Sequence, residues 1–274
     1  MLDRIIEKSP AKLNLFLKII SKRKDGFHNI RSGVTLLNIY DEIIAEKNSK
    51  FSIKYIGDFA PINNNYDNCI IEKIFKFIKI KKPNYRFIIK KNLPVMSGLG
   101  SASSNAAATL RILEKLNLIK LKDIYQFTKI GSDIPIFINL NDCLVRGIGD
   151  KITNQVFPKY YFLLVKPVSN CSTELMYKKL NTTNLIKKNE YDSNAINDYD
   201  SGNDFEKIII KENNEIKNIL KFLQNLDKKI FSGITGSGSC CFAAFDSYEI
   251  ADNSLNLFKQ SYPNLWSLVA ENNC

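Results

Sequence analysis

The chain has 274 residues, of which 45% are hydrophobic and 24% charged, a composition typical of a globular protein with a substantial core. The net charge of +11 invites a nucleic-acid interpretation, but the lysines are spread along the whole length, and this spread argues against a clustered nucleic-acid surface. Six cysteines without a C-x-x-C pair, and a single histidine, argue against zinc and favour reduced thiols in the cytoplasm. No apolar run is long enough for a membrane span or signal peptide. We therefore expect no nucleic-acid partner, no membrane partner and no protein-built metal site.

The first predicted strand covers residues 9–20, SPAKLNLFLKII. Apolar side chains alternate along one face, while Lys12 and Asn14 lie on the other. A lysine in the middle of so apolar a strand needs a carboxylate or phosphate partner, although a solvated lysine is the commoner case. Residues 51–56 and 85–90 are further strand candidates, and residues 69–80 have a helical period.

A turn signal at Asp25-Gly26 precedes Phe27 and His28. A lone histidine beside an aromatic residue is more often structural or exposed. The alternative is that the two rings stack on, and hydrogen-bond to, a flat heterocycle.

A glycine-rich turn in LPVMSGLGSASSNAAATL, residues 93–110, leads into a helix predicted from Asn105 onward. Gly98 and Gly100 permit a close approach of backbone to ligand, and the serines that follow are N-cap candidates, namely Ser101, Ser103 and Ser104. Such a turn presents unpaired N–H groups to an anion, usually phosphate. The motif is neither a Walker A loop nor a complete dinucleotide fingerprint. An ordinary serine-capped helix therefore remains an alternative.

Asp133 lies in GSDIPIF, residues 131–137, two positions before Pro135, which we expect to hold Ile134 in an extended conformation. The simple interpretation is a turn or cap aspartate. As an active group, Asp133 could orient or deprotonate a substrate hydroxyl, and Lys12 could keep it ionised.

The later part of the chain contains a predicted buried strand at 159–167, a surface loop at 181–204 and a helix at 204–226. Residues 231–245 form a glycine-rich turn that leads into a strand. Gly236 and Gly238 either bring backbone N–H groups to a phosphate or substrate, or simply make a tight turn. We place a domain boundary near residue 150, which gives domains of 1–150 and 151–274.

These motifs, in this order, resemble the GHMP kinase family over nearly the whole chain: SPAKLNLFLKI, KDGFH, LPVMSGLGSASSNAA, GSDIPIF, NDFE and TGSGSC. The resemblance implies an α+β fold of two lobes with the active site in the cleft between them. The N-terminal ATP-binding lobe, 1–150, would resemble domain 2 of ribosomal protein S5, and the C-terminal lobe, 151–274, would be ferredoxin-like. It also implies a small-molecule kinase that uses ATP and Mg²⁺.

The resemblance assigns site residues position by position. Lys12 and Asp133 match the family's catalytic pair. The ATP-binding positions would be Lys91, Pro94, Val95, Met96, Ser97, Gly98, Leu99, Gly100, Ser101, Ala102, Ser103 and Ser104. The substrate-binding positions would be Asn14, Phe27, His28, Thr173, Tyr177, Gly236 and Ser237. His28 would meet the edge of a cytosine, and Tyr177 would stack on one of its faces.

PAKLNLFL and DGFH are most similar to family members that phosphorylate the 2-hydroxyl of a cytidine diphosphate-linked methylerythritol, in the non-mevalonate route to isoprenoids. We expect such an enzyme to be a monomer or a weak homodimer. Two alternatives remain: a mevalonate- or homoserine-type kinase of the same family, and a basic RNA-binding module. An aromatic clamp for a base would favour the first interpretation over the other kinases. An RNA-binding module would instead show clustered basic residues and exposed aromatics, and would not require a buried Lys12–Asp133 pair.

Overall fold

The computed structural model describes residues 2–62, 69–180 and 202–272. Helices and sheets are mixed along the chain, which confirms the predicted α+β class. The chain forms two compact units, each assembled from separate segments. Unit 1 comprises Met1–Ala11, Ile39–Val95 and Gly100–Asn141. Unit 2 comprises Lys12–Asn38, Met96–Leu99 and Asp142–Cys274.

Two long strands, β1 (Arg4–Lys22) and β2 (His28–Lys47), pair with each other and contribute residues to both units. The predicted strand at 9–20 is the central part of β1. Its polar face is buried as well as its apolar face, since Lys12 and Asn14 are each only 6% exposed. Polar side chains buried this deeply need hydrogen-bond partners, and this requirement shapes the candidate site.

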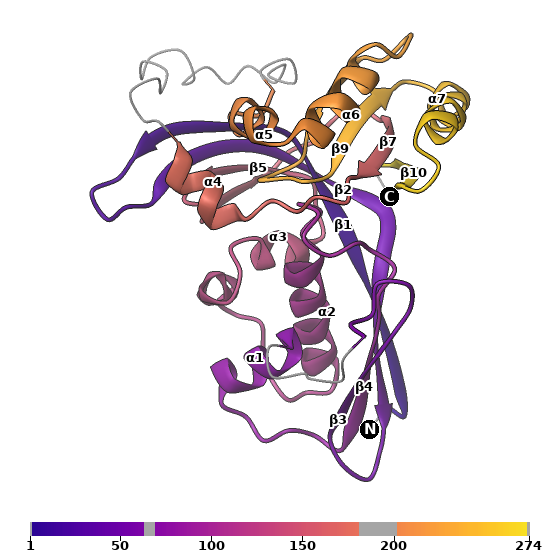
Figure 1. The fold of residues 1–274 in the computed structure, drawn as a ribbon. Helices are drawn as coiled ribbons and strands as arrows, with labels where there is room; N and C mark the ends of the chain where they lie inside the picture. Colours follow the sequence, from indigo (N-terminus) through magenta and orange to yellow (C-terminus); the bar gives the residue numbers. More distant parts are fainter. Residues whose placement is uncertain (1, 63–68, 181–201, 273–274) are drawn as a thin grey trace. The chain divides into compact units, whose positions relative to one another are not determined.

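Unit 1 contains β3 (Ser52–Ile56) and β4 (Tyr85–Lys90), with β4 parallel to β3 and antiparallel to β2. Its helices are α1 (Ile70–Ile78), α2 (Ser101–Lys115), η1 (Ile124–Lys129) and α3 (Ile134–Asn139). In Figure 1, α1, α2 and α3 lie on one side of β3 and β4. The strands predicted at 51–56 and 85–90 and the helix predicted at 69–80 are therefore confirmed.

Two local expectations in unit 1 are wrong. Helix α2 begins at Ser101 rather than Asn105, because Gly100 adopts φ +74° and is itself the N-cap. The three serines therefore lie in the first turn of the helix instead of capping it. Ile134 is not extended but opens α3, since Pro135 occupies the first turn, where its missing N–H leaves no hydrogen bond unmade.

Unit 2 has a four-stranded antiparallel sheet in the order β10 (Trp266–Glu271), β7 (Tyr161–Lys166), β9 (Cys241–Phe245), β8 (Phe231–Ile234). Strands β5 (Cys143–Gly147) and β6 (Lys151–Asn154) extend the sheet of β2. The predicted strand at 159–167 is β7, and the glycine-rich turn predicted before a strand joins β8 to β9.

Helices α4 (Thr173–Lys179), α5 (Glu206–Glu212), α6 (Asn214–Gln224) and α7 (Tyr248–Ser261) also belong to unit 2. The single helix predicted at 204–226 is two helices, because the chain turns at Asn213, whose side chain caps α6 by accepting from the N–H of Ile216. Most of the surface loop predicted at 181–204 lies outside the described residues.

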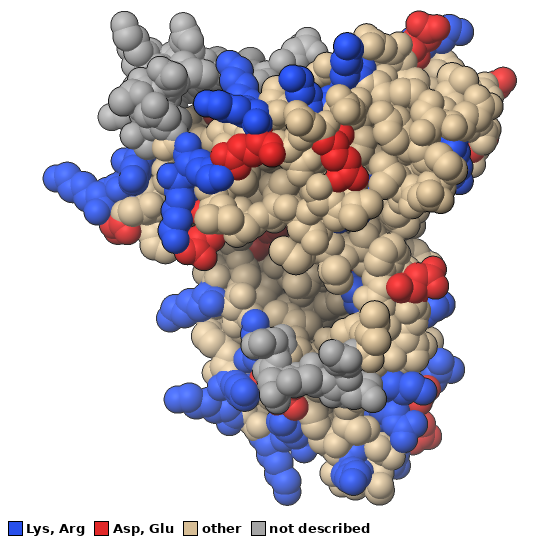
Figure 2. Space-filling model, viewed as in Figure 1, with Lys and Arg blue, Asp and Glu red and all other residues tan. Residues whose placement is uncertain are grey.

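The helices and the charged side chains bear on the expectations about a membrane and about nucleic acid. Within the described ranges, no helix combines the length and the apolar character that crossing a bilayer requires. On the face drawn in Figure 2, Lys and Arg side chains occur in several separate groups with Asp and Glu side chains near them.

Phe87 of β4 is fully buried and packs near Phe51 and edge-on to Phe75 of α1. We expect Phe87→Ala to lower the free energy of unfolding by about 3–5 kcal/mol, through lost burial and the cavity left behind. Urea denaturation followed by circular dichroism measures this. Ile62→Ala is the control, since Ile62 is fully exposed in the same unit and should change little. Equal effects of the two substitutions would contradict the assigned core.

Candidate active site

In unit 2, three distant stretches of backbone meet at Met96–Leu99. The N–H of Lys12 donates to the carbonyl of Leu99 at 2.9 Å, and the N–H of Cys240 donates to the carbonyl of Ser97 at 2.9 Å. Gly98 lies between these bonds with φ +80°, and a Cβ there would overlap the carbonyl oxygen of Thr235. Glycine is therefore required at this position on two counts, its backbone conformation and its space.

Lys12 and Asn14 project from β1 beside this contact. The ammonium of Lys12 donates to Oδ1 of Asn14, and the Asn14 N–H donates to Thr235 Oγ1 at 2.9 Å. Gly236 adjoins both side chains, since a Cβ on it would lie 3.2 Å from Lys12 Nζ and from Asn14 Oδ1. Three residues predicted from two separate motifs, Lys12, Asn14 and Gly236, are thus neighbours within one unit.

Asn203 was assigned no function from the sequence, although it opens the NDFE motif. Its buried side-chain nitrogen donates to the carbonyls of Ile234 and Gly236 at 2.8 and 2.7 Å. The next residue, Asp204, pairs with Lys18 of β1 at 2.9 Å. The motif therefore fastens the turn that carries Gly236 to the strand that carries Lys12 and Asn14. The NDFE motif, which belongs to the resemblance but was given no role there, was the signal in the sequence.

The predicted base-binding residues include one ring pair. The rings of His28 and Tyr177 stack with centroids 5.2 Å apart, and Tyr177 meets Phe205 edge-on. A third ring between two others needs a separation of about 7 Å, so a base does not fit between His28 and Tyr177 as they stand. Phe27 is 60% exposed. The hydroxyls of Thr173 and Ser237, two other residues predicted to bind substrate, form a hydrogen bond at 2.6 Å.

His28 is buried, and its Nε2 has no hydrogen-bond partner among the described residues. Burial lowers the pKa of His28, and the positive charge of Lys22 lowers it further. A neutral imidazole can donate from one nitrogen and accept at the other. This ring nitrogen is therefore a polar group with which a ligand could form a hydrogen bond.

Unit 1 holds the rest of the predicted residues. Helix α2 starts without a side-chain cap, so its first N–H groups are available to an anion. Gly131 packs against Ser103, which brings the turn before Asp133 to the first turn of α2. Asp133 is half-buried at the N-terminus of α3, makes no capping bond there, and accepts from Ser132 Oγ at 3.3 Å. Its carboxylate is thus not used to cap the helix.

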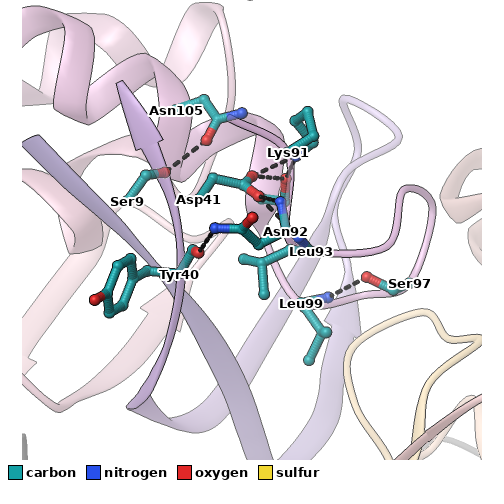
Figure 3. A network of polar contacts seen from close by, with 10 residues as sticks. Ser9, Tyr40, Asp41, Lys91, Asn92, Leu93, Ser97, Leu99 and Asn105 are labelled. Carbon is teal, nitrogen blue, oxygen red and sulfur yellow. Dashed lines mark hydrogen bonds and ion pairs between the residues drawn. The ribbon is translucent and has the colours of Figure 1, made fainter. Parts of the chain in front are cut away.

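Lys91 was predicted to bind ATP. In the structure its side chain is 5% exposed, and its ammonium pairs with Asp41 inside unit 1 (Figure 3). The same ammonium donates to the hydroxyl of Ser101. Burial lowers the pKa of Lys91, and the Asp41 carboxylate opposes that shift. Asp41 was missed from the sequence. Its one signal was an aspartate in the middle of a strand segment rich in apolar residues, NIYDEIIAE, where a charge that becomes buried is costly unless paired.

No three side chains of His, Cys, Asp or Glu gather as a metal-binding group in the part of the chain that the structure describes. A magnesium ion bound to a nucleotide takes most of its ligands from phosphates and water, with one or two carboxylates from protein. The described residues therefore fit an ion that the nucleotide carries, rather than one held by a cluster of protein side chains.

Two family models match the chain. Residues 65–139 match the GHMP kinases N terminal domain, and residues 180–264 match the GHMP kinases C terminal domain. The chain therefore belongs to the GHMP kinase family, as the resemblance of its motifs predicted.

Individual relatives and solved structures are similar to the chain over most of its length. The chain is 35% identical to a 4-diphosphocytidyl-2-C-methyl-D-erythritol kinase of Prochlorococcus marinus subsp. pastoris, covering 94% of this chain and 90% of that protein. It is 36% identical to the kinase of the same name from Wigglesworthia glossinidia brevipalpis, covering 90% and 82%. Among solved structures, a 4-(cytidine 5'-diphospho)-2C-methyl-D-erythritol kinase aligns with TM-score 0.79 at 18% identity, covering 98% and 100%. The phosphomevalonate kinase of Streptococcus pneumoniae aligns with TM-score 0.67 at 12% identity, covering 99% and 100%.

His28 is the single histidine, so its proton resonance is unambiguous in an NMR titration. We expect a midpoint below 6.5, because burial and Lys22 both disfavour the imidazolium. Lys22→Gln should raise the midpoint, whereas Lys50→Gln, in unit 1, should not. Since the unfolded chain binds the proton more readily, this residue's contribution to stability is present above pH 6.5 and declines as the pH falls through that value. A midpoint above 6.5 in the wild type would contradict the buried environment.

Proposed function

We propose that the protein transfers the γ-phosphoryl group of ATP to the 2-hydroxyl of 4-diphosphocytidyl-2-C-methyl-D-erythritol, giving the 2-phosphate and ADP. The observation that carries the proposal is the identity of 35% over 94% of the chain with a kinase of that name. The reaction would serve isoprenoid precursor synthesis in the cytoplasm, where the free thiols of the described cysteines are stable. We propose a monomer or weak homodimer as the working form.

The phosphates of ATP would be held by the loop Pro94–Ser104. Gly98 and Gly100 have positive φ angles, which turn backbone N–H groups in ways that other residues rarely permit. The start of α2, which has no side-chain cap, adds the positive end of the helix dipole. Neither feature needs a Walker lysine. Magnesium, when bound with ATP, would neutralise phosphate charge.

Lys12 and Asp133 would act on the groups that react, namely the acceptor hydroxyl and the transferred phosphoryl group. Asp133 would accept the proton of the attacking hydroxyl as the new P–O bond forms and the bond to ADP breaks. Lys12 would offset negative charge on the transferred group. Its position is set by Asn14, which is itself held by Thr235 and by Ser32, whose hydroxyl accepts from the Asn14 amide at 2.8 Å.

A nucleobase on the substrate distinguishes this reaction from those of mevalonate and homoserine kinases. The region of His28, Tyr177 and Phe27 supplies aromatic surface and a buried ring nitrogen without a partner among the described residues. Such groups suit the flat face and polar edge of cytosine. A substrate without a base would leave them unused. Membership of a kinase family also favours an enzyme over a basic RNA-binding module.

The first test measures ADP release with Mg·ATP and each of three acceptors: the cytidyl-methylerythritol substrate, mevalonate and homoserine. We expect turnover with the first alone. Asp133→Asn should lower kcat by about 10²–10⁴-fold while leaving ATP binding intact, because it removes the proton acceptor. The matched control is Asp123→Asn, which keeps a cap on η1 in the same unit. Turnover with mevalonate or homoserine instead would overturn the substrate assignment.

A further inference from the structure

Asp41 of β2 holds both ends of the loop that follows β4. One carboxylate oxygen, Oδ1, accepts from the N–H groups of Asn92 and Leu93, each at 2.8 Å. The other, Oδ2, accepts from the ammonium of Lys91 and from the hydroxyl of Ser101 at 2.9 Å. Figure 3 shows these contacts converging on a single side chain. One carboxylate thereby binds where the loop leaves β4 and where α2 begins.

The start of α2 is fixed through two charged groups at once. The Lys91 ammonium contacts Ser101 Oγ as well as Asp41, so both members of the ion pair reach the same hydroxyl. One turn further along, with the Asn105 amide nitrogen turned toward Asp41, that nitrogen donates to Asp41 Oδ2 at 3.1 Å and to Ser9 Oγ at 2.6 Å. The helix end that presents N–H groups to an anion is thus attached to β1 and β2 side chains within unit 1.

Burial makes this arrangement sensitive to charge. Asp41 is 0% exposed and Lys91 is 5% exposed. Removing the charge of one partner leaves the other buried without its counter-ion, which is strongly unfavourable. The glycines between the two held ends resist deformation little. The loop therefore depends on its ends for a defined conformation.

We infer that Asp41 is a positioning residue for the phosphate-binding loop, acting through Lys91, the Asn92 and Leu93 amides and Ser101. This inference rests on the proposed function of the loop Pro94–Ser104. Asp41 is fully buried and would act through the loop, so its effect falls on nucleotide binding rather than on recognition of the acceptor. Lys91 is then the buried counter-ion of Asp41, the residue that positions the loop.

The test compares Asp41→Asn with Glu7→Gln. Glu7 forms a largely buried ion pair with Arg111 and a second pair with Lys115. Arg111 lies ten residues or about 15 Å along α2 from Ser101, so the loss of Glu7 destabilises the same unit away from the loop. Each protein is measured for thermal midpoint, for the affinity of a non-hydrolysable ATP analogue with Mg²⁺ by calorimetry, and for both KM values. We expect Asp41→Asn to weaken nucleotide affinity and raise the KM for ATP by about tenfold or more, with an unchanged KM for the acceptor.

Glu7→Gln should lower the thermal midpoint without weakening nucleotide affinity or raising the KM for ATP relative to that for the acceptor. The double variant Asp41→Asn/Lys91→Met removes the unpaired charge and keeps the test decisive if the single variant does not fold. The double variant should regain stability but not nucleotide affinity. Recovery of both would overturn the inference. Equal nucleotide affinities in Asp41→Asn and Glu7→Gln would also overturn it. Analogue binding without turnover of the cytidyl substrate would overturn the proposed function alone, and the affinities would still decide the role of Asp41. Failure of the wild type to bind the analogue would overturn both.

Discussion

The contact at Gly98 is the constraint on which the unit 2 part of the candidate site depends. Two backbone hydrogen bonds, from Lys12 to Leu99 and from Cys240 to Ser97, bring the loop against β1 and against the turn after β8. They form only because position 98 has no side chain, since a Cβ would overlap the carbonyl of Thr235. Segments far apart in the chain thus reach hydrogen-bond distance, and the functional side chains on each become neighbours.

A second layer of polar residues holds these segments in place. Asn203 binds the carbonyls on either side of Thr235, and Asp41 binds backbone amides at the base of the loop. Both residues satisfy main-chain groups that would otherwise be buried without partners, at a cost of about 1–3 kcal/mol each. The backbone beside Lys12 and Asn14 and the base of the loop therefore depend on buried amide and carboxylate side chains.

Local pattern was enough to predict the elements whose periodicity is strong. The alternation in residues 85–90 gave β4, and the apolar spacing in residues 69–80 gave α1. Local pattern failed where backbone conformation overrode it. Gly100 caps α2 through a left-handed conformation, so the helix starts before its apolar stripe does. Asn213 divides a stretch whose apolar period continues through it.

Some of the candidate residues could likewise be predicted from the sequence, and others could not. Lys12, Asn14 and Gly236 come from motifs that the sequence displays, and the structure makes them neighbours. Asp41 and Asn203 act on main-chain atoms distant in the chain, Asp41 on Asn92 and Asn203 on Gly236, and no spacing rule connects them. The partner of a buried polar side chain is a property of the folded chain, which is why these two roles could not be predicted.

The burial of Asp41 and Lys91 separates two uses of charge in this protein. The exposed lysines behind the net charge of +11 attract anionic reactants over distances that ionic strength controls, about 8 Å at physiological salt. The Asp41–Lys91 pair is closed to dissolved ions, because neither side chain is more than 5% exposed. Added salt should therefore slow the capture of a nucleotide without loosening the loop that receives it. The encounter with ATP would respond to the ionic composition of the cell, while the shape of the receiving loop would be insulated from it.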